Sequence, residues 1–294
     1  MLYTEDFLKY LELERNYSSR TINSYKEDLH LFDLFLCEQQ IPLDPTLLTS
    51  DILRVWIIDM MEHHQKASSV CRRLSTLRTF FKYLLSKDKI SSDPTRQVKG
   101  PKKEKPLPYF LKENEINFLL DSSPESYSYS DVRDQLIIKV FYETGIRLSE
   151  LLNLETTDIE LDSQYIKVTG KRNKQRIIPY GKELQDDITH FLKIRKEEFK
   201  EPIKTLFLSE KGEQMTPYQV RKCVKNQLSK VSTLKKQSPH ILRHTFATTM
   251  LNHQANLEAV KELLGHKSLS TTEIYTHTTF EELKKIYNKA HPRS

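Results

Sequence analysis

The sequence predicts a mainly α-helical protein of two domains, the second of which is mixed α+β with a small β-hairpin. Only 6 of its 294 residues are glycine, about 2% against a usual share of about 7%, which disfavours turn-rich all-β folds. Apolar residues recur at three- and four-residue spacing through most of the chain. A segment rich in proline, lysine and arginine interrupts this pattern, so we expect domains at 1–95 and 109–294, joined by a basic linker at 96–108.

The first domain is expected to be a bundle of about four helices, because helical periodicity continues from Tyr3 to about Ser92. Phe7, Leu8 and Leu11 share one face of the first helix. The second helix follows a serine cap at Ser18 or Ser19, and its apolar face carries Tyr25, Leu29, Phe32 and Leu36. The third carries the apolar run 55–58, and the fourth extends over about 68–85.

The second domain begins with helical patterns at 113–120 and 132–142. One clear β signal follows: the strands 165–169 and 176–180 flank the polar, cationic turn Gly170-Lys-Arg-Asn-Lys-Gln175, a pattern typical of a hairpin. Helical periodicity then predicts five more segments, near 217–231, 239–253, 256–264, 271–277 and 280–288.

The cysteines exclude two kinds of site. Cys37, Cys71 and Cys223 are odd in number, far apart and without C-x-x-C spacing, so the sequence indicates neither a disulfide framework nor a thiolate zinc centre. The acidic N-terminus does not resemble a signal peptide, and no apolar run approaches the roughly 20 residues of a membrane span. We therefore expect a cytoplasmic protein in a reducing compartment, without membrane attachment.

Positive charge is concentrated in one stretch of the chain. Residues 66–105 hold 12 Lys or Arg against 3 acidic residues, whereas residues 1–50 hold 4 basic and 9 acidic ones. A basic stripe of this kind favours a polyanionic partner, although a solvated helix face followed by a basic linker would have the same composition. The candidate contacts are Lys66, Arg72, Arg73, Arg78, Lys102, Lys103 and Lys105.

Six residues of the second domain form the candidate active site: Arg147, Lys171, His240, Arg243, His266 and Tyr275. Each has an ordinary structural explanation when taken alone; Arg147, for example, could simply pair with Glu150 one turn further on. Their arrangement favours a shared role. His240 and Arg243 lie three residues apart, so on a helix they share a face and can contact one phosphate, and Gly265 offers a helix cap that presents His266.

Five motifs carry these residues, and with them the sequence resembles the tyrosine recombinase family, in particular the Xer site-specific recombinases. They are Thr-Gly-Ile-Arg147-Leu-Ser-Glu-Leu, Gly-Lys171-Arg-Asn-Lys-Gln-Arg-Ile-Ile-Pro, Pro-His240-Ile-Leu-Arg243-His-Thr, Leu-Leu-Gly-His266-Lys-Ser-Leu-Ser and Ile-Tyr275-Thr-His. The resemblance extends over nearly the whole chain and implies a SAM-like core-binding domain followed by a catalytic domain. One departure is Arg172, in the hairpin turn, where relatives often have glycine.

The resemblance also implies the chemistry. Tyr275 is the nucleophile that forms a 3′-phosphotyrosyl link, and Arg147 and Arg243 clamp the phosphate, since a guanidinium presents a planar fork to two oxygens. His240 acts as general base, His266 donates a hydrogen bond to the phosphate, and Lys171 is the general acid for the departing 5′-oxygen. No cofactor or metal ion is implied, because side chains alone supply the positive charge and the proton transfers.

The partners that the resemblance implies are double-stranded DNA, further protomers in a tetramer on two DNA sites, a related recombinase and a DNA translocase of the division machinery. Strands would be exchanged through a Holliday junction, to resolve chromosome dimers. The C-terminal helix would dock on the neighbouring protomer, although its apolar face could equally pack on its own domain. Alternatives are an integrase of a phage or mobile element, a type IB topoisomerase and a non-catalytic architectural DNA binder.

Overall fold

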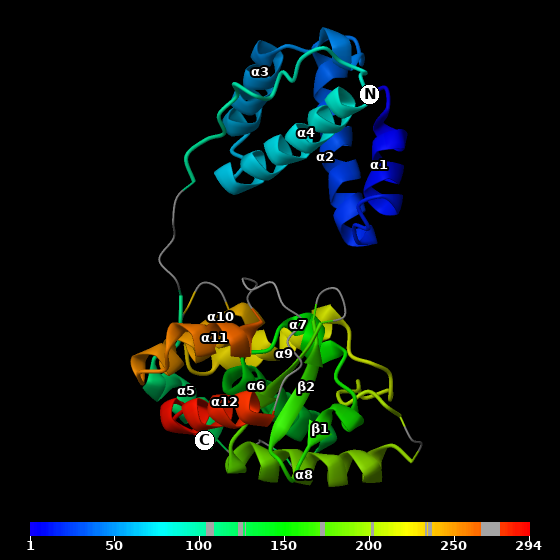
Figure 1. Ribbon diagram of the computed structural model, residues 1–294. Helices are drawn as coiled ribbons and strands as arrows, with labels where there is room; N and C mark the ends of the chain where they lie inside the picture. The colour runs from blue at the N-terminus through cyan, green and yellow to red at the C-terminus, as the bar shows by residue number, and fades with distance from the viewer. Residues whose placement is uncertain are drawn as a thin grey trace. The chain divides into compact units, whose positions relative to one another are not determined.

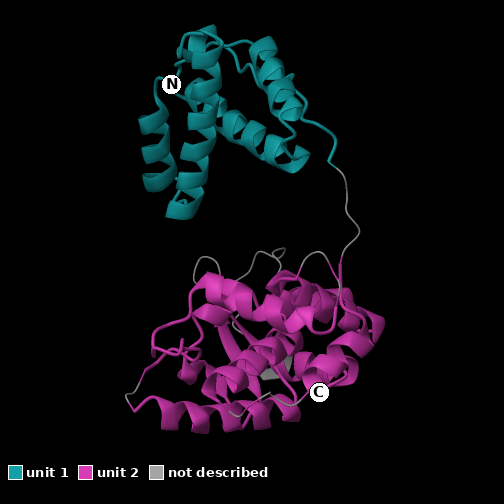
Figure 2. Cartoon of the chain, turned by 180° about the vertical axis from the view of Figure 1, so that it is seen from behind, with its two compact units in different colours: residues 1–106 teal, residues 107–294 magenta. Residues whose placement is uncertain are grey.

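The computed structural model describes residues 1–103, 109–122, 126, 128–170, 174–200, 203–232, 234, 237–265 and 277–294, with side chains of the last segment from residue 280. The chain divides into two compact units, residues 1–106 and 107–294 (Figure 2). This division falls within the segment 96–108 that the sequence predicts as a linker. The mainly helical fold class is confirmed: a helical first unit precedes a second unit of helices and one small sheet.

The described residues of the first unit form four α-helices and a short 3-10 helix: α1 (Thr4–Leu13), α2 (Ser19–Glu38), η1 (Pro45–Leu47), α3 (Ser50–Glu62) and α4 (Ala67–Ser86) (Figure 1). The N-terminus of α2 is capped by Ser18, whose hydroxyl accepts a hydrogen bond from the amide of Thr21. The core contains large aromatic side chains, and Trp56 of α3 packs on Phe32 of α2 with ring centroids 4.7 Å apart. Burial of these apolar faces is the main force that holds the bundle together.

A buried carboxylate joins α2 to α4. Asp28 is 1% exposed, and its Oδ2 accepts hydrogen bonds from Arg72 Nη1 at 2.6 Å and Thr76 Oγ1 at 2.8 Å. The Arg73 Nε lies 3.7 Å from Oδ1 of the same carboxylate. Because an unpaired buried charge is costly, these contacts fix the register of the two helices, and they engage two of the arginines in the basic stripe.

The chain beyond α4 packs back along that helix. Val98 is 1% exposed, and its carbonyl oxygen accepts a hydrogen bond from Arg78 Nη2 at 2.7 Å. The Cys71 thiol donates to the carbonyl of Pro101 at 3.4 Å. The packed part of the first unit therefore extends to Pro101, beyond residue 95 where the sequence predicts the domain to end.

The second unit contains the remaining elements. They are α5 (Glu113–Asp121), α6 (Tyr129–Thr144), α7 (Leu148–Leu152), η2 (Thr156–Asp158), β1 (Ile159–Glu160), β2 (Tyr165–Thr169), β3 (Gln175–Pro179), α8 (Lys182–Glu198), α9 (Pro217–Ser229), α10 (Pro239–Asn252), α11 (Leu257–Leu264) and α12 (His277–Ala290). Helix α6 is the central one: it contacts α5, α8, α9 and α10, and its buried residues lie on all of its faces.

The sheet is antiparallel, in the order β1-β2-β3 (Figure 1). Strands β2 and β3 form the predicted hairpin, with Ile166 opposite Ile178 and Val168 opposite Arg176. The two-residue strand β1 is an addition that the sequence did not predict, because so short a strand leaves no periodic signal. The predicted helix 280–288 lies inside α12, whereas the one at 271–277 falls almost entirely outside the described residues.

Helix α12 packs on its own unit, where it contacts α10, α11 and β3. Tyr287 is fully buried and His291 is 3% exposed; their rings stack with centroids 4.9 Å apart. Beyond the helix, Arg293 pairs with Glu183 at 2.9 Å and with Asp121. The chain described here therefore has its C-terminal helix in place on its own core, and docking on a neighbouring protomer stays a prediction.

The burial of His291 makes the stability of the second unit depend on pH. Burial lowers the pKa of its imidazole to about 3, with the charge of Arg293 acting in the same direction. The folded state therefore holds a neutral ring that an unfolded chain would protonate below about pH 6.5. This stabilisation is complete above that pH and is lost progressively as the pH falls toward 3, by up to about 1.4 kcal/mol for each pH unit.

We therefore expect the urea midpoint of the second unit to fall between pH 7 and pH 5 by more in the native protein than in a His291→Gln variant. Far-UV circular dichroism follows both units, whereas the single tryptophan, Trp56, reports the first, so the two transitions can be separated. His190→Gln, at an exposed position of α8, is the control and should keep the native pH dependence. Equal slopes for the native protein and His291→Gln would contradict the expectation.

Candidate active site

Arg147 lies at the junction between α6 and α7. Helix α6 is capped at its C-terminus by Gly145, whose φ of 59° is a left-handed conformation that glycine adopts readily. Two residues later, Arg147 is the N-terminal cap of α7. Its amide donates to Glu150 Oε2 at 2.7 Å and its Nη1 donates to Oε1 at 2.8 Å. The guanidinium is therefore bound by a carboxylate, while the Arg147 side chain as a whole is 37% exposed.

Arg243 approaches the same turn from α10. It is 9% exposed, and its two terminal nitrogens donate to the carbonyl oxygens of Gly145 and Leu264. Gly145 is two residues from Arg147, and Leu264 is the last residue of α11. These contacts place Arg243 between the turn that carries Arg147 and the C-terminal end of α11.

Three arginines bind consecutive carbonyls at the end of α11. Arg176 Nε donates to Leu263 O at 2.7 Å, Arg243 Nη2 donates to Leu264 O, and Arg147 Nη2 donates to Gly265 O at 3.0 Å. The last carbonyls of a helix lack intrahelical partners and carry partial negative charge, so they attract cations. The structure thus brings together both predicted catalytic arginines at the two residues that precede His266.

The charges of this arginine cluster favour the binding of an anion. Burial would raise the pKa of Glu150, but its hydrogen bonds with Arg176, that residue's charge and the contacts with Arg147 outweigh burial and lower the pKa to about 2. Burial and the charges of the other two arginines lower the pKa of Arg243 to about 10, so it remains protonated at neutral pH. Among the described residues, three cations therefore surround one carboxylate, and the excess positive charge suits a phosphate diester.

The remaining predicted residues are placed as follows. His240 lies exposed in the first turn of α10, one turn before Arg243. Lys171, His266 and Tyr275 lie outside the described residues, as does Arg172. For two of them the preceding residue is described: Gly170 directly follows β2 at the base of the hairpin turn, and Gly265 caps α11 with a φ of 64°. The segments that lead into Lys171 and His266 are therefore fixed in the structure.

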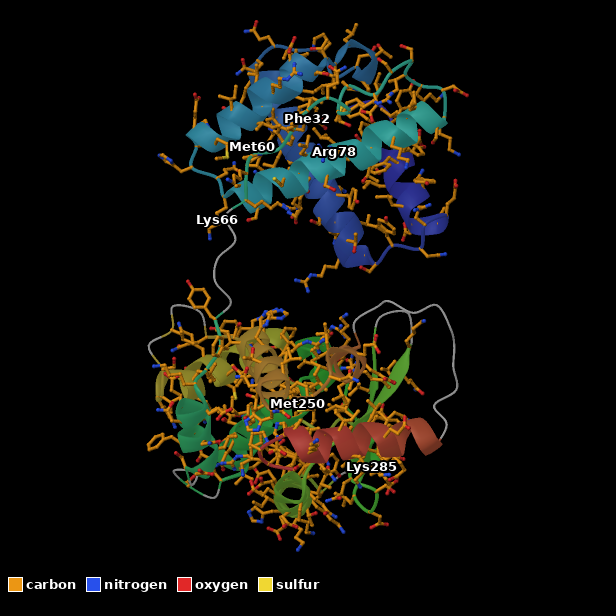
Figure 3. The ribbon with its side chains drawn as sticks, turned by 60° about the vertical axis from the view of Figure 1, so that its left-hand side comes forward. Phe32, Met60, Lys66, Arg78, Met250 and Lys285 are labelled. Carbon is orange, nitrogen blue, oxygen red and sulfur yellow. The ribbon has the colours of Figure 1, made fainter. Side chains whose placement is uncertain are left out.

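In the first unit the basic residues predicted to contact DNA differ in how far their side chains are exposed to solvent. Lys66 is exposed at the start of α4, and Arg78 is exposed further along the same helix (Figure 3). Lys102 and Lys103 are exposed beyond the helix. Two more belong to the Asp28 network: Arg72 is 48% exposed, whereas Arg73 is only 16% exposed and also donates to Gln65. Lys105 lies outside the described residues.

Arg176 is not among the site residues predicted from the sequence, although the alternation of β3 indicates that its side chain is buried. In a strand, alternate residues face the same side of the sheet, and Arg176 shares the buried side of β3 with Ile178. An arginine at such a position is rarely buried unless it is paired. Glu150 was considered only as a surface partner of Arg147, whereas it is 3% exposed and is bound by both guanidiniums.

The part of the chain that the structure describes contains no group of three or more His, Cys, Asp or Glu side chains that could hold a metal ion. None of the helices within the described ranges is both long and apolar enough to cross a membrane.

Known proteins share this fold and these motifs. The family model for the phage integrase family matches residues 109–282, and the model for its N-terminal SAM-like domain matches residues 4–88. Relatives called tyrosine recombinase XerC include those of Listeria welshimeri, 38% identical over 99% of this chain and 97% of the relative, and of Staphylococcus aureus, 39% identical over 99% and 96%. The relative from Chlorobaculum parvum is 35% identical over 99% and 94%.

Solved structures agree on the fold. A XerH site-specific recombinase bound to a palindromic difH substrate superposes with a TM-score of 0.71 at 23% identity, covering 96% of this chain and 83% of that one. The Tn1549 transposon integrase in complex with circular intermediate DNA gives a TM-score of 0.71 at 18% identity, covering 98% and 95%. These similarities concern the arrangement of the backbone in both units.

The family models and the relatives define an enzyme of site-specific DNA recombination, with a helical SAM-like first unit and an arginine-rich second unit. The chain belongs to the phage integrase family, whose members are tyrosine recombinases, and the resemblance predicted from its motifs is confirmed.

Proposed function

We propose that the chain is a Xer-type recombinase that resolves chromosome dimers in the cytoplasm, by cutting and rejoining DNA through a 3′-phosphotyrosyl intermediate and a Holliday junction. One observation carries the proposal: Arg147 and Arg243, 96 residues apart in the sequence, bind the adjacent carbonyls of Gly265 and Leu264. Two guanidiniums that converge at the entry to the segment bearing His266 and Tyr275 match what transfer of a phosphodiester requires.

In the proposed reaction, the Tyr275 oxygen attacks the phosphorus, so that the bond from phosphorus to the tyrosyl oxygen forms and the bond to the 5′-oxygen breaks. His240 takes the phenolic proton, and Lys171 gives a proton to the departing 5′-oxygen. Arg147 and Arg243 neutralise the charge that grows on the non-bridging oxygens, with a further hydrogen bond from His266. A 5′-hydroxyl of another strand can reverse the step, so no external energy source is needed.

The partner of the first unit would be the DNA duplex. Lys66, Arg78, Lys102 and Lys103 are exposed, and Arg72 is half exposed, so we assign phosphate contacts to these five and leave Arg73 out because most of its side chain is buried. The undescribed Lys105 would extend the set. Contacts of this type make binding fall steeply with salt concentration.

The proposed assembly is a tetramer on two DNA sites, formed with a related recombinase and regulated by a DNA translocase of the division machinery. Each site would then be held by two protomers. The support is the identity of 35% and more with XerC proteins over nearly the full chain. The second candidate is an integrase of a mobile element, favoured by the structural similarity to the Tn1549 transposon integrase; the chemistry would be the same in a different setting.

The site on the genome distinguishes these two functions. We expect native protein incubated with sheared genomic DNA of its source organism to form covalent complexes that, after protease digestion and sequencing, map to one site at the replication terminus. Recovery at the ends of an integrated element would instead support the second candidate. The absence of any covalent complex would contradict both.

Complex formation should be unchanged, within about twofold, in excess EDTA, because the guanidiniums of the cluster supply the positive charge that a metal ion supplies in other phosphoryl transfer enzymes. The measurement is the single-turnover rate on a nicked duplex that carries the recovered site, with and without chelator. A rate that collapses in EDTA and returns with magnesium would contradict the expectation.

A further inference from the structure

We propose that Arg176 is a positioning residue for the cleavage reaction, because its one guanidinium hydrogen-bonds to two segments of the active site and lies beside a third. These segments lead into Arg147, Lys171 and His266. The inference rests on the function proposed above and adds to it a residue that does not itself contact the DNA. Arg176 lies on β3 and is 6% exposed.

Arg176 contacts the first segment, which carries Arg147, by binding the carboxylate of Glu150. Arg176 Nη1 and Nη2 donate to Glu150 Oε1 and Oε2 at 2.8 and 2.9 Å, a bidentate pair. The same two oxygens accept the side chain and the backbone amide of Arg147, at 2.8 and 2.7 Å. Because the carboxylate is held by Arg176 on one side, the guanidinium of Arg147 is fixed on the other.

The second segment is the base of the hairpin turn. The Gly170 amide donates to the carbonyl of Lys174 at 2.7 Å and closes the turn in which Lys171 follows. A Cβ built on Gly170 would lie 3.5 Å from Glu150 Oε1 and 4.0 Å from Arg176 Nη1. A side chain at this position would thus begin in contact with the ion pair, so the pair lies beside the residue that precedes the proposed general acid.

The third segment is the end of α11. Arg176 Nε donates to Leu263 O at 2.7 Å, and a Cβ built on Gly265 would lie 3.1 Å from Arg176 Nη1. Gly265 has no side chain and adopts a positive φ of 64°, so the guanidinium packs closely on its backbone. The position of the residue before His266 is thus set by the same side chain that holds Glu150.

Arg176 also keeps Glu150 ionised. Burial alone would raise the pKa of this carboxyl, and the hydrogen bonds and charge of Arg176 are the largest effects that lower it. The charged groups that face Glu150 from the described elements are Arg147, Arg176 and Arg243. Without Arg176 the pKa of Glu150 should rise toward or above its ordinary value of 4.5. A protonated Glu150 is a weaker acceptor for Arg147, so a variant should lose activity as the pH falls.

The test compares Arg176→Met and Arg176→Lys with a matched control, Arg133→Met. Arg133 is also 6% exposed, and it also binds one carboxylate and one carbonyl: its Nε donates to Asp134 Oδ1 at 2.8 Å and its Nη1 to Leu208 O at 2.9 Å. The measurements are the single-turnover rate of covalent complex formation between pH 5 and pH 9, on a nicked duplex carrying the recovered site, and the dissociation constant for the same duplex.

We expect Arg176→Met to lower the rate at pH 7 by about 10- to 100-fold, the range that misplacement of catalytic groups produces, with a dissociation constant within about threefold of native. The loss should deepen toward pH 5, and Arg176→Lys should recover part of the rate. Arg133→Met should keep the native pH profile. Should Arg176→Met not fold, the pH profile of Arg176→Lys decides: its loss of rate relative to the native protein should deepen toward pH 5.

Parallel pH profiles for the native protein, the Arg176 variants and Arg133→Met, with equal losses for the two methionine variants, would overturn the inference and leave Arg176 a purely structural residue. A native protein that forms no covalent complex would instead overturn the proposed function. The two failures are therefore distinguishable in one set of measurements.

Discussion

Replacing Tyr275 with phenylalanine is expected to abolish covalent complex formation, with a loss of at least about 10⁴-fold, the scale on which removal of a catalytic nucleophile acts. The substitution removes the one oxygen proposed to bond to phosphorus and leaves the aromatic ring. Duplex binding should stay within about twofold of native, because the phosphate contacts are made by other side chains. The measurement is the yield of DNA-linked protein on a nicked suicide substrate, together with the dissociation constant for the same duplex.

Tyr218→Phe is the matched control. Tyr218 is 70% exposed on α9, so the same loss of a hydroxyl there should leave the yield at the native value. Continued covalent linkage in Tyr275→Phe would contradict the assignment, and peptide mapping of the linked residue would then identify the true nucleophile.

Replacing Arg243 with alanine should lower the rate of cleavage by about 10³-fold. A single preorganised donor to a developing oxyanion is worth about 10² to 10³ in rate, and a charged, bidentate donor lies at the upper end of such effects. The contacts among the described residues use two of its five N–H donors, so others can face a phosphate. Arg243→Lys keeps the charge without the planar fork and should fall between native and alanine.

Loss of Arg243 also leaves the carbonyls of Gly145 and Leu264 without this donor, which costs about 1–3 kcal/mol for each buried group left unpaired. A control must therefore lose comparable contacts away from the site. Arg195, 8% exposed, donates to the carbonyls of Ile203, Thr205 and Leu206. Arg195→Ala should lose stability and keep the native cleavage rate per folded molecule. If Arg195→Ala and Arg243→Ala lose cleavage equally, the phosphate role of Arg243 is wrong.

Much of the local structure could be predicted because it depends on neighbours in the sequence. The cap at Ser18, the β2-β3 hairpin and the glycine after α11 all follow from residues within a few positions of one another. The same holds for the capping interaction between Arg147 and Glu150, which are three residues apart. Such features are determined by side-chain geometry and backbone preferences.

What could not be predicted depends on contacts between distant segments. Arg147 and Gly265 are separated by 118 residues, and Arg176 and Leu263 by 87. The alternation in β3 indicates that Arg176 is buried, but no local pattern shows that three guanidiniums meet at one helix end. The packing of Val98 against α4 and of α12 on its own unit likewise depends on which apolar surfaces meet in the folded chain.

The most direct test of the phosphate clamp is a cryo-electron microscopy structure of Tyr275→Phe bound to an intact duplex that carries the recovered site. We expect the scissile phosphate between the guanidiniums of Arg147 and Arg243, with residue 275 facing the phosphorus opposite the 5′-oxygen in the protomer poised to cleave. A scissile phosphate that contacts neither arginine, in a complex where the duplex is fully engaged, would contradict the central claim.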